Sequence, residues 1–521
     1  MDWLLKKSKD VTSSLEQTIE STTKQVTAHS GSVLDRVGSL VKKDEPAFPT
    51  FCITFRSPDL ISVLHAEEEV EKMLHDTLNE MRRGAVERTV DTANEHAVVF
   101  QIKGDPFTVK CDKEEVIHIR RVCCVWLEKL ASMGWKPMAS ADLSLDDGLT
   151  SWFFEYTGKP KEVSDRDVIA LAVQESDLLI LINNRPPLVP ALQDAVGDHA
   201  QKVEKTKTGD FTMKIRGNPW DPTTLNAFDD GMKGRRILLE VFKNFAAQNY
   251  QFYGHVNLQS ASDTIMFVKE PRQEIMRFAM LSLNGKDKIR FLDMPEKHRK
   301  QIHKCIAEHW QQGVQSTEEY EEYDAFEYKL KGCPWNCRGD EALRARILMA
   351  NLLQCLYQCG WGVEVALDLS ADQDDKSVFV LRPITASGIA RTFAKRRETN
   401  HVCLAPVEKN KLQLLNAPRD MLIKVKETVR TMLKANVDAE KSLQMGCYEW
   451  TIKGTPWACG GKINDDGIMA RHVMTVMLAI LKKQGWRPVA SADISAIREM
   501  KGSPSDTHTL FFRYDSKLVE T

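Results

Sequence analysis

The sequence lacks the features that would place it across a membrane or in a secreted compartment. No stretch of its 521 residues approaches the roughly 18 uninterrupted apolar residues that a membrane-spanning helix needs. Residues 1–7 run into polar positions before the apolar core of a secretory signal can form. We therefore expect a cytoplasmic protein whose 12 cysteines are reduced thiols.

An excess of charge of one sign is also missing. The 71 basic and 73 acidic residues leave a formal net charge of −2, so the chain has no overall field that would concentrate nucleic acid around it. Hydrophobic residues make up 42% of the chain and charged residues 28%, which is the usage of folded globular domains. We expect several domains in a chain of this length, and we do not expect nucleic acid as a partner.

The common signatures of catalysis and cofactor binding are missing as well. Neither a G-x-x-x-x-G-K-[ST] nor a G-x-G-x-x-G loop connects a strand pattern to a helix pattern, and no histidine recurs at a fixed place along the chain. Cys333, Cys337, Cys355 and Cys359 have a spacing that zinc ligands use, but no other part of the chain shares this set, so we interpret them as buried thiols. We predict no metal, no cofactor and no catalytic residue.

What the sequence does contain is a fourfold internal repeat. A glycine–x–proline–aromatic tetrapeptide recurs at domain-sized intervals of 113, 115 and 122 residues. Each copy closes an apolar run typical of a strand, and it is followed by an acidic residue, a helical pattern and two more strand patterns. The four copies begin at Gly104, Gly217, Gly332 and Gly454.

The segment before each tetrapeptide repeats more loosely as two strands and a helix, with a proline near the helix start at Pro187, Pro295 and Pro418. Each unit is therefore predicted as ββαβαββ, with about five strands and two helices on one face of the sheet. This is an α+β fold of four tandem two-layer sandwiches. The predicted domains span residues 50–158, 165–270, 275–384 and 388–516, after an N-terminal segment of residues 1–45.

An arginine recurs in the second helix of every repeat, 14 residues before a turn marked by glycine or an aromatic residue. An acidic residue precedes it by six positions, and we interpret that acid as lying at the helix N-cap or in the first helical turn. We interpret the arginine as the structural partner of a short Asp–Leu–Ser motif such as the one at Asp142. The alternative is that these arginines bind the anionic group of a ligand. They are Arg120, Arg236, Arg346 and Arg471.

Residues 1–45 follow a different pattern. Their sparse apolar residues recur every 11 positions, which is three helical turns at about 3.67 residues per turn and traces one stripe along a helix. The pattern resembles the 11-residue amphipathic repeats of apolipoproteins, perilipins and synucleins, and this resemblance implies contact with a lipid surface. The alternatives are a helix packed on the repeats, a coiled coil or a disordered tail. The predicted lipid-contacting residues are Trp3, Leu4, Leu5, Leu15, Ile19, Val26, Val33 and Val37.

Two functional hypotheses follow from this organisation. The first is a non-enzymatic cytosolic adaptor, because four related domains without a recurring catalytic set can combine several weak binding sites through effective concentration. The second is an enzyme, or a protein that binds a small anionic ligand, with its site between repeats. The expected partners are proteins or a small anionic ligand, with a lipid surface contacted through residues 1–45.

Overall fold

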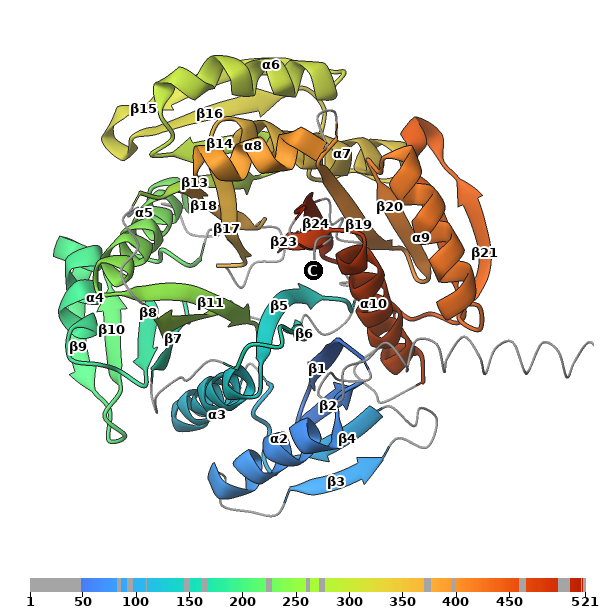
Figure 1. Cartoon of the computed structure of the whole chain (residues 1–521). Coiled ribbons are helices and arrows are strands. Elements are labelled where there is room, and N and C mark those ends of the chain that lie inside the picture. The colour runs from blue at the N-terminus through green and yellow to red at the C-terminus, as the bar shows by residue number, and fades with distance from the viewer. Residues whose placement is uncertain are drawn as a thin grey trace, which may run out of the picture. The chain divides into compact units, whose positions relative to one another are not determined.

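A computed structural model describes residues 48–81, 86–90, 97–108, 110–144, 150–160, 167–221, 227–258, 263–270, 277–369, 376–395, 399–458, 465–494, 507–516 and 518. The predicted lipid-contacting residues lie outside this part of the chain. From Thr50 onward the chain forms one unit of four domains with the same topology (Figure 1). The predicted α+β class with four tandem repeats is confirmed.

Each domain has six strands and two main helices among its described residues. The first contains β1 (Thr50–Arg56), β2 (Leu60–Leu64), α2 (Glu68–Met81), β3 (Glu87–Val90), β4 (Ala97–Gln101), α3 (Lys113–Ser132), β5 (Trp135–Asp142) and β6 (Thr150–Tyr156). The second contains β7 (Val168–Gln174), β8 (Leu178–Ile182), α4 (Leu188–Val196), β9 (Ala200–Lys205), β10 (Phe211–Ile215), α5 (Ala227–Ala247), β11 (Tyr250–Val256) and β12 (Thr264–Lys269).

The other two domains repeat this order. The third contains β13 (Ala279–Asn284), β14 (Lys288–Leu292), α6 (Arg299–His309), β15 (Val314–Tyr320), β16 (Ala325–Leu330), α7 (Gly339–Gln358), β17 (Trp361–Leu367) and β18 (Val378–Pro383), and α8 (Ala386–Lys395) follows it. The fourth contains β19 (His401–Val407), β20 (Lys411–Leu415), α9 (Arg419–Met432), β21 (Val437–Ser442), β22 (Tyr448–Ile452), α10 (Asp465–Lys483), β23 (Trp486–Ala492) and β24 (Thr509–Tyr514).

The sheets are antiparallel and have one strand more than the sequence predicts. The order in the first sheet is β3-β4-β2-β1-β6-β5, and the other three sheets match it position for position. The strand that sequence analysis missed is the outer edge strand: β3, β9, β15 or β21. Most residues of β9, β15 and β21 are exposed, so these strands lack the apolar alternation that marks a half-buried strand. Charged side chains along such an edge discourage pairing with other chains.

The glycine–x–proline–aromatic turn closes each sandwich. Its aromatic ring is buried in all four domains, at Phe107, Trp220, Trp335 and Trp457. Gly454 has a φ of 68°, in the left-handed region that glycine adopts without strain. A Cβ on Gly454 would also lie 2.1 Å from Oδ1 of Asp466, whose Oδ2 accepts a hydrogen bond from the Thr455 backbone N–H. The glycine therefore leaves room for the carboxylate that holds the turn.

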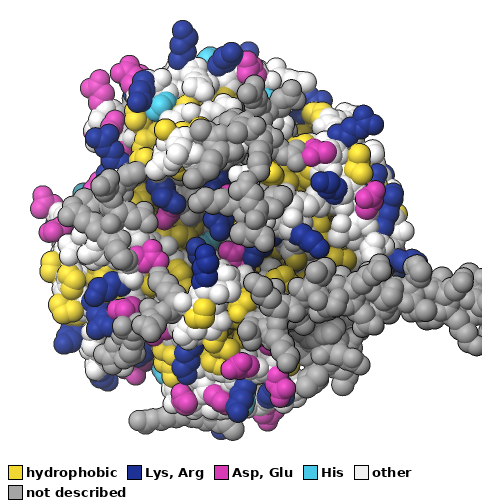
Figure 2. All heavy atoms as spheres, in the orientation of Figure 1, with side chains coloured by type: hydrophobic (Ala, Val, Ile, Leu, Met, Phe, Trp, Pro, Cys, Tyr) yellow, Lys and Arg dark blue, Asp and Glu magenta, His cyan; other side chains and the backbone are white. Residues whose placement is uncertain are grey.

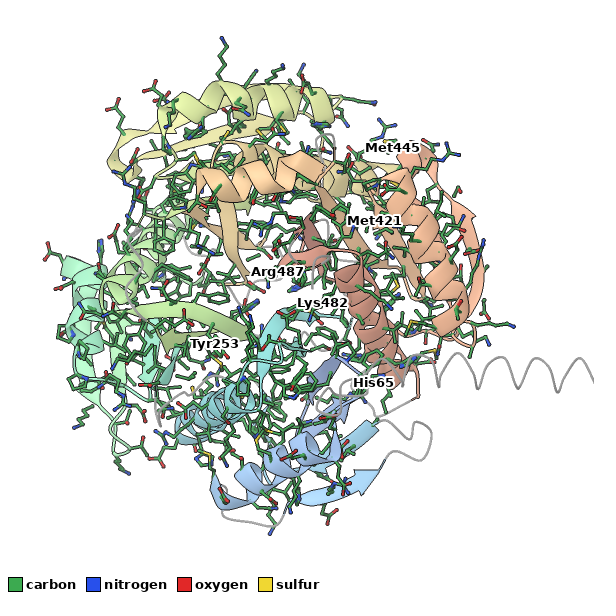
Figure 3. The ribbon with its side chains drawn as sticks, viewed as in Figure 1. His65, Tyr253, Met421, Met445, Lys482 and Arg487 are labelled. Carbon is green, nitrogen blue, oxygen red and sulfur yellow. The ribbon has the colours of Figure 1, made fainter. Side chains whose placement is uncertain are left out.

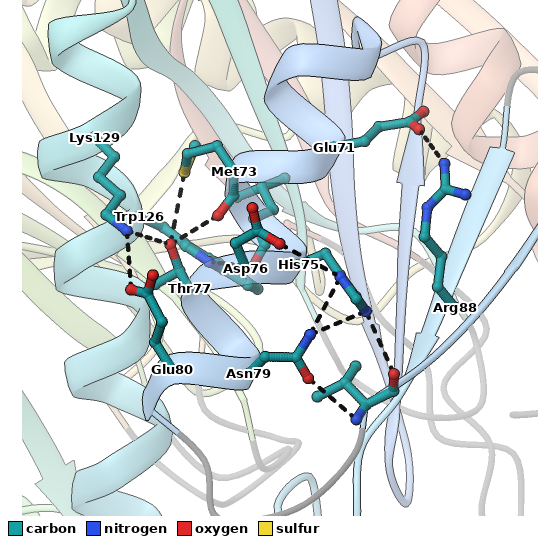
Figure 4. Close-up of polar contacts among 12 residues, drawn as sticks. Glu71, Met73, His75, Asp76, Thr77, Asn79, Glu80, Arg88, Trp126 and Lys129 are labelled. Carbon is teal, nitrogen blue, oxygen red and sulfur yellow. Dashed lines mark hydrogen bonds and ion pairs between the residues drawn. The ribbon is translucent and has the colours of Figure 1, made fainter.

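The two helices of a domain pack side by side on its sheet. In the first domain, Trp126 Nε1 on α3 donates to the Leu74 carbonyl on α2 over 3.2 Å, and Lys129 Nζ donates to Thr77 Oγ1 over 2.8 Å (Figure 4). On the outer side, Arg88 of β3 is paired with Glu71 of α2. The first helix thus covers the outer half of the sheet and the second helix the inner half.

The second helix of each domain also covers the sheet of the next domain. Helix α3 packs against β7 and β8, α5 against β13, α7 against β19 and β20, and α10 against β1. The last of these contacts closes the four domains into a ring (Figure 1). Because helices lie on both faces of each sheet, the central strands are largely buried, and β1 is buried along its whole length, including its polar residues Thr50, Thr54 and Arg56.

Candidate functional site

Three of the recurrent arginines make the same buried contact, with a hydroxyl group of the neighbouring domain. Arg120 Nε donates to Thr264 Oγ1 of the second domain over 2.7 Å, and Arg346 Nε donates to Thr509 Oγ1 of the fourth domain over 3.1 Å. The side chains of Arg120, Arg346 and Arg471 are all buried between two sheets. Burial lowers the pKa of Arg120 to about 10. The acceptor in the next domain was not apparent from the sequence. Arg471 makes the same contact with Ser151 of the first domain.

In the second domain the structural counterpart of these arginines is Arg235, one position before the predicted Arg236. Asn249, with a φ of 66°, takes the left-handed turn position of Gly134, and Tyr250 begins β11 as Trp135 begins β5. The predicted spacing had aligned Tyr250 with the glycine. Arg236 instead pairs with Asp293 of the third domain and donates to the Tyr323 carbonyl.

The Asp–Leu–Ser motif also lies at a domain boundary. The His508 N–H donates to the Asp142 carbonyl over 3.0 Å, and the Asp263 N–H donates to the Asp368 carbonyl over 2.9 Å. The Thr150 N–H donates to the carbonyl of Asn257, which replaces the aspartate in the second domain. These hydrogen bonds link the start of the last strand in one domain to the motif of the next domain. The copies of the motif therefore hold the ring together.

The inner edge strands β5, β11, β17 and β23 surround the centre of the ring. Strand β5 contacts β11 and β23, and β17 contacts β23. Each of these strands has a bulge at the same place in its pairing with the last strand of its domain. A bulge bends an edge strand and turns an extra side chain aside. The four bulge residues, all facing one central cavity, are Met138, Tyr253, Glu364 and Val489.

The central cavity has a volume of about 340 Å³ and receives residues from all four domains. This volume is in the range of small-molecule sites in proteins. The face of the molecule shown in Figure 2 is hollowed at its centre, where basic and acidic side chains lie next to each other. Figure 3 places Tyr253, Lys482 and Arg487 around this centre, on β11, α10 and β23.

Two arginines of like charge lie opposite each other in the cavity wall. Arg487 of β23 and Arg513 of β24 are direct partners in the strand register. At the same register the first domain has Lys136 opposite Glu155. Like charges directly opposite in an antiparallel pair destabilise a sheet. Burial lowers the pKa of Arg513, Tyr357 and Asp515 oppose this shift, and the positive charges of Arg487 and Arg382 add to it.

Three carboxylates line the cavity, from Glu155, Glu270 and Glu364, and the first and last of these are paired with cations. Glu155 lies 2.9 Å from Lys482 Nζ and 3.8 Å from the Arg487 guanidinium, and Glu364 is paired with Arg382. Burial raises the pKa of the Glu364 carboxyl, although Arg382 opposes this shift. Arg513 stacks on the Tyr357 ring at 4.6 Å, and its Nε is buried without a hydrogen-bond partner among the described residues.

One end of the cavity, which we call the floor, is polar and carries no permanent positive charge. It is formed by the second residue after each bulge, namely Ser140, His255, Ala366 and Ser491. His255 Nδ1 lies 3.2 Å from Asp263 Oδ2, and Ser491 Oγ lies 3.2 Å from Nδ1 of His508. Burial lowers the pKa of His508 and so favours its neutral form. The Ser140 hydroxyl is buried without a hydrogen-bond partner in the described part of the chain.

The cysteines considered as zinc ligands are distributed over the third domain. Cys333 lies in the turn after β16, Cys337 is buried beside it, and Cys355 and Cys359 lie at the end of α7. Cys355 Sγ donates to the Gln301 carbonyl of α6. Within the described ranges, no three His, Cys, Asp or Glu side chains are grouped as a metal site.

The cavity residues were not predicted from the sequence because they are not shared by the four copies of the repeat. Lys136, Gln251, Gly362 and Arg487 occupy one position of the repeat, the residue after the aromatic that begins the inner edge strand. Their chemistry differs from copy to copy. The signal that could have indicated the cavity is the variation in charge at this one position of the repeat.

Comparison with known proteins identifies the repeated unit. A single domain-family model matches the chain four times, over residues 49–155, 167–268, 277–382 and 400–513. No curated protein and no solved structure matches the chain. Among the described residues, no helix is both long enough and apolar enough to cross a membrane.

Proposed function

The chain belongs to the family defined by this domain, and from this premise we propose that its four copies form a ring that binds a small anionic ligand in the central cavity. The observation that carries the proposal is the register partnership of Arg487 and Arg513 inside that cavity. A pair of like charges costs stability in the empty protein. An anion between the two guanidinium groups would offset that cost and would accept their planar, fork-like hydrogen bonds.

The charge balance around the cavity supports this proposal. Glu155 is shared between Lys482 and Arg487, and Glu364 is paired with Arg382. Arg513 has an aromatic ring on one side and no described carboxylate within ion-pair distance. A positive charge held in a concave, partly desolvated wall attracts anions more strongly than the same charge on an open surface.

The test is the stabilisation of the full chain by inorganic phosphate and by sulfate, measured as the melting temperature at constant ionic strength with chloride as reference. A ligand that binds only the folded ring raises the melting temperature as its concentration passes its dissociation constant. Arg487→Gln and Arg513→Gln should remove most of this rise. The matched control is Arg430→Gln, which removes an exposed arginine of α9 paired with Glu440.

Two results would contradict the proposal. One is a melting temperature that responds to sulfate and chloride alike. The other is that sulfate raises the melting temperature of Arg487→Gln and Arg513→Gln as much as it raises that of the control Arg430→Gln. This comparison requires that all three variants have native circular dichroism.

The multivalent adaptor remains the second proposal, and one feature of the structure favours it. The outer edge strands β9, β15 and β21 expose most of their residues and differ in charge: β15 contains Glu318 and Glu319, whereas β9 contains Lys202 and Lys205. Four fixed but chemically different edges suit several partners on one rigid ring. Capture of different partners from cytosol by chains altered at single edges would test this role.

A further inference from the structure

The floor of the central cavity contains polar groups that an anion alone would not engage. Ser140, His255 and Ser491 face the cavity from three different domains. Ser140 Oγ is buried and lacks a hydrogen-bond partner among the described residues. A buried hydroxyl without a partner lowers the stability of the folded protein, so a cavity that contains one suits a ligand that supplies the missing hydrogen bond.

The floor and the arginine pair lie at different heights of the same strands, and the strand register places Arg487 and Ser491 on opposite faces of their sheet. Arg487 and Ser491 are four residues apart on β23, and Lys136 and Ser140 are four residues apart on β5. At ~3.3 Å per residue, shortened by the bulge, this separation is about 10 Å along the strand. A single small anion such as phosphate cannot contact both levels, whereas a molecule of the length of a phosphorylated sugar can.

The chemistry of the floor suits hydroxyl groups. Ser491 Oγ and His508 Nδ1 form one hydrogen-bonded pair, and His255 faces Asp263. Serine hydroxyls and neutral imidazoles both donate and accept hydrogen bonds, as the hydroxyl groups of a sugar do. The floor has no arginine or lysine among its residues, so a second anionic group is not favoured there.

We infer that the ligand of the central cavity is a polyhydroxylated anion, whose anionic group contacts Arg487 and Arg513 and whose hydroxyl groups contact Ser140, His255 and Ser491. This inference rests on the proposed anion-binding function and adds the chemical class of the ligand.

The experiment is calorimetric titration of the full chain with three matched probes. Glucose 6-phosphate has both the phosphate and the hydroxyl groups, n-hexyl phosphate has the phosphate without hydroxyl groups, and glucose has no anionic group. Two or more hydrogen bonds of about 1 kcal/mol each predict that glucose 6-phosphate binds at least about tenfold more tightly than n-hexyl phosphate. We expect no measurable binding of glucose.

Single variants locate the source of the preference. Ser140→Ala should lower the affinity ratio of glucose 6-phosphate to n-hexyl phosphate by about fivefold, the value of one hydrogen bond. Ser491→Ala provides a second test if the first variant has a lowered melting temperature. Ser132→Ala, at an exposed serine of α3 whose hydroxyl contacts only its own helix, is the control.

The outcomes separate this inference from the proposed function. If both phosphates bind equally and Arg487→Gln weakens both, the anion site stands and the polyhydroxylated ligand is excluded. If glucose 6-phosphate is preferred but neither serine variant lowers the ratio, the assignment of the floor is wrong. If no phosphate probe binds, the anion-binding function itself is wrong.

Discussion

Arg471 on α10 donates from Nε to the hydroxyl of Ser151 on β6 over 3.1 Å, although the two residues are 320 positions apart in the chain. The bond joins the fourth domain to the first and therefore closes the ring. Nearby, His65 Nε2 lies 2.8 Å from Nδ1 of His472 across the same boundary (Figure 3). A recurrent residue that sequence comparison finds within each domain thus acts between domains.

The first prediction concerns the hydroxyl groups that these arginines contact. Thr264→Val and Thr509→Val should each lower the free energy of unfolding by about 1–3 kcal/mol, because each removes the acceptor of a buried guanidinium N–H. Valine is nearly isosteric with threonine, and it occurs naturally at the equivalent position of the third domain, Val378. Urea unfolding measures the change.

The control for this series is Thr431→Val on α9, where an exposed threonine hydroxyl contacts a carbonyl of its own helix. Surface changes of this kind stay within about 0.5 kcal/mol. Equal unfolding midpoints for Thr264→Val, Thr509→Val and Thr431→Val would show that the contacts between domains do not support the ring.

The second prediction concerns the pH dependence of anion binding. Burial raises the pKa of the Glu364 carboxyl, so this group is neutral below its folded pKa and negative above it. Sulfate affinity should therefore fall as the pH rises from 4.5 through the folded pKa of Glu364. Sulfate is the appropriate probe because it does not titrate in this interval. Titration calorimetry at several pH values measures the effect.

Glu364→Gln keeps the neutral state at every pH and should flatten this dependence. The same raised pKa means that the folded chain binds more protons than the unfolded chain between 4.5 and the folded pKa, so the contribution of Glu364 to stability falls as the pH rises through that interval. A sulfate affinity that falls equally in the variant would assign the pH dependence to another group.

The third prediction concerns His508 and acid stability. Burial lowers the pKa of His508 below the ordinary value of 6.5, whereas the nearby carboxylates of Asp493 and Asp263 oppose the shift and His255 adds to it. Between the folded pKa and 6.5 the unfolded chain binds more protons, so stability should decrease as the pH falls below 6.5. His508→Gln should reduce the slope of melting temperature against pH, and an unchanged slope would contradict this assignment.

The fourth prediction concerns the N-terminal segment. If residues 1–45 contact lipid, the full chain should float with liposomes rich in packing defects, and a chain that begins at Ala47 should remain in the aqueous fraction. A full chain with Trp3, Leu4 and Leu5 changed to serine should float less, because it removes the largest apolar groups of the stripe. Equal flotation of all three chains would exclude recruitment through this segment.

The repeat and its elements could be predicted from the sequence because local chemistry determines them. In the glycine–x–proline–aromatic turn, Gly454 has the left-handed conformation that glycine favours, and the ring of Trp457 is buried, as the corresponding ring is in the other three domains. The helices and the inner strands have long apolar periodicities for the same reason. The outer edge strand β15 has no such periodicity, because its extended conformation depends on its pairing with the neighbouring strand β16.

The candidate site could not be predicted in the same way. Arg487 and Arg513 are 26 positions apart in the chain, and only the register of β23 with β24 makes them partners. Ser140, His255 and Ser491 come from three domains and meet only after the ring has closed. Even the assignment of Arg236 failed by one position, because Asn249 adopts the turn conformation that glycine adopts in the other copies.

The sequence by itself determined four copies of an α+β sandwich, since apolar spacing and turn residues act over a few neighbours along the chain. The tertiary structure alone decided that these copies close into a ring and which side chains face its centre. The physical reason is that the second face of each sheet is covered by a helix of another domain. Apolar periodicity in the sequence indicates that a face is buried, but it does not indicate which domain covers that face.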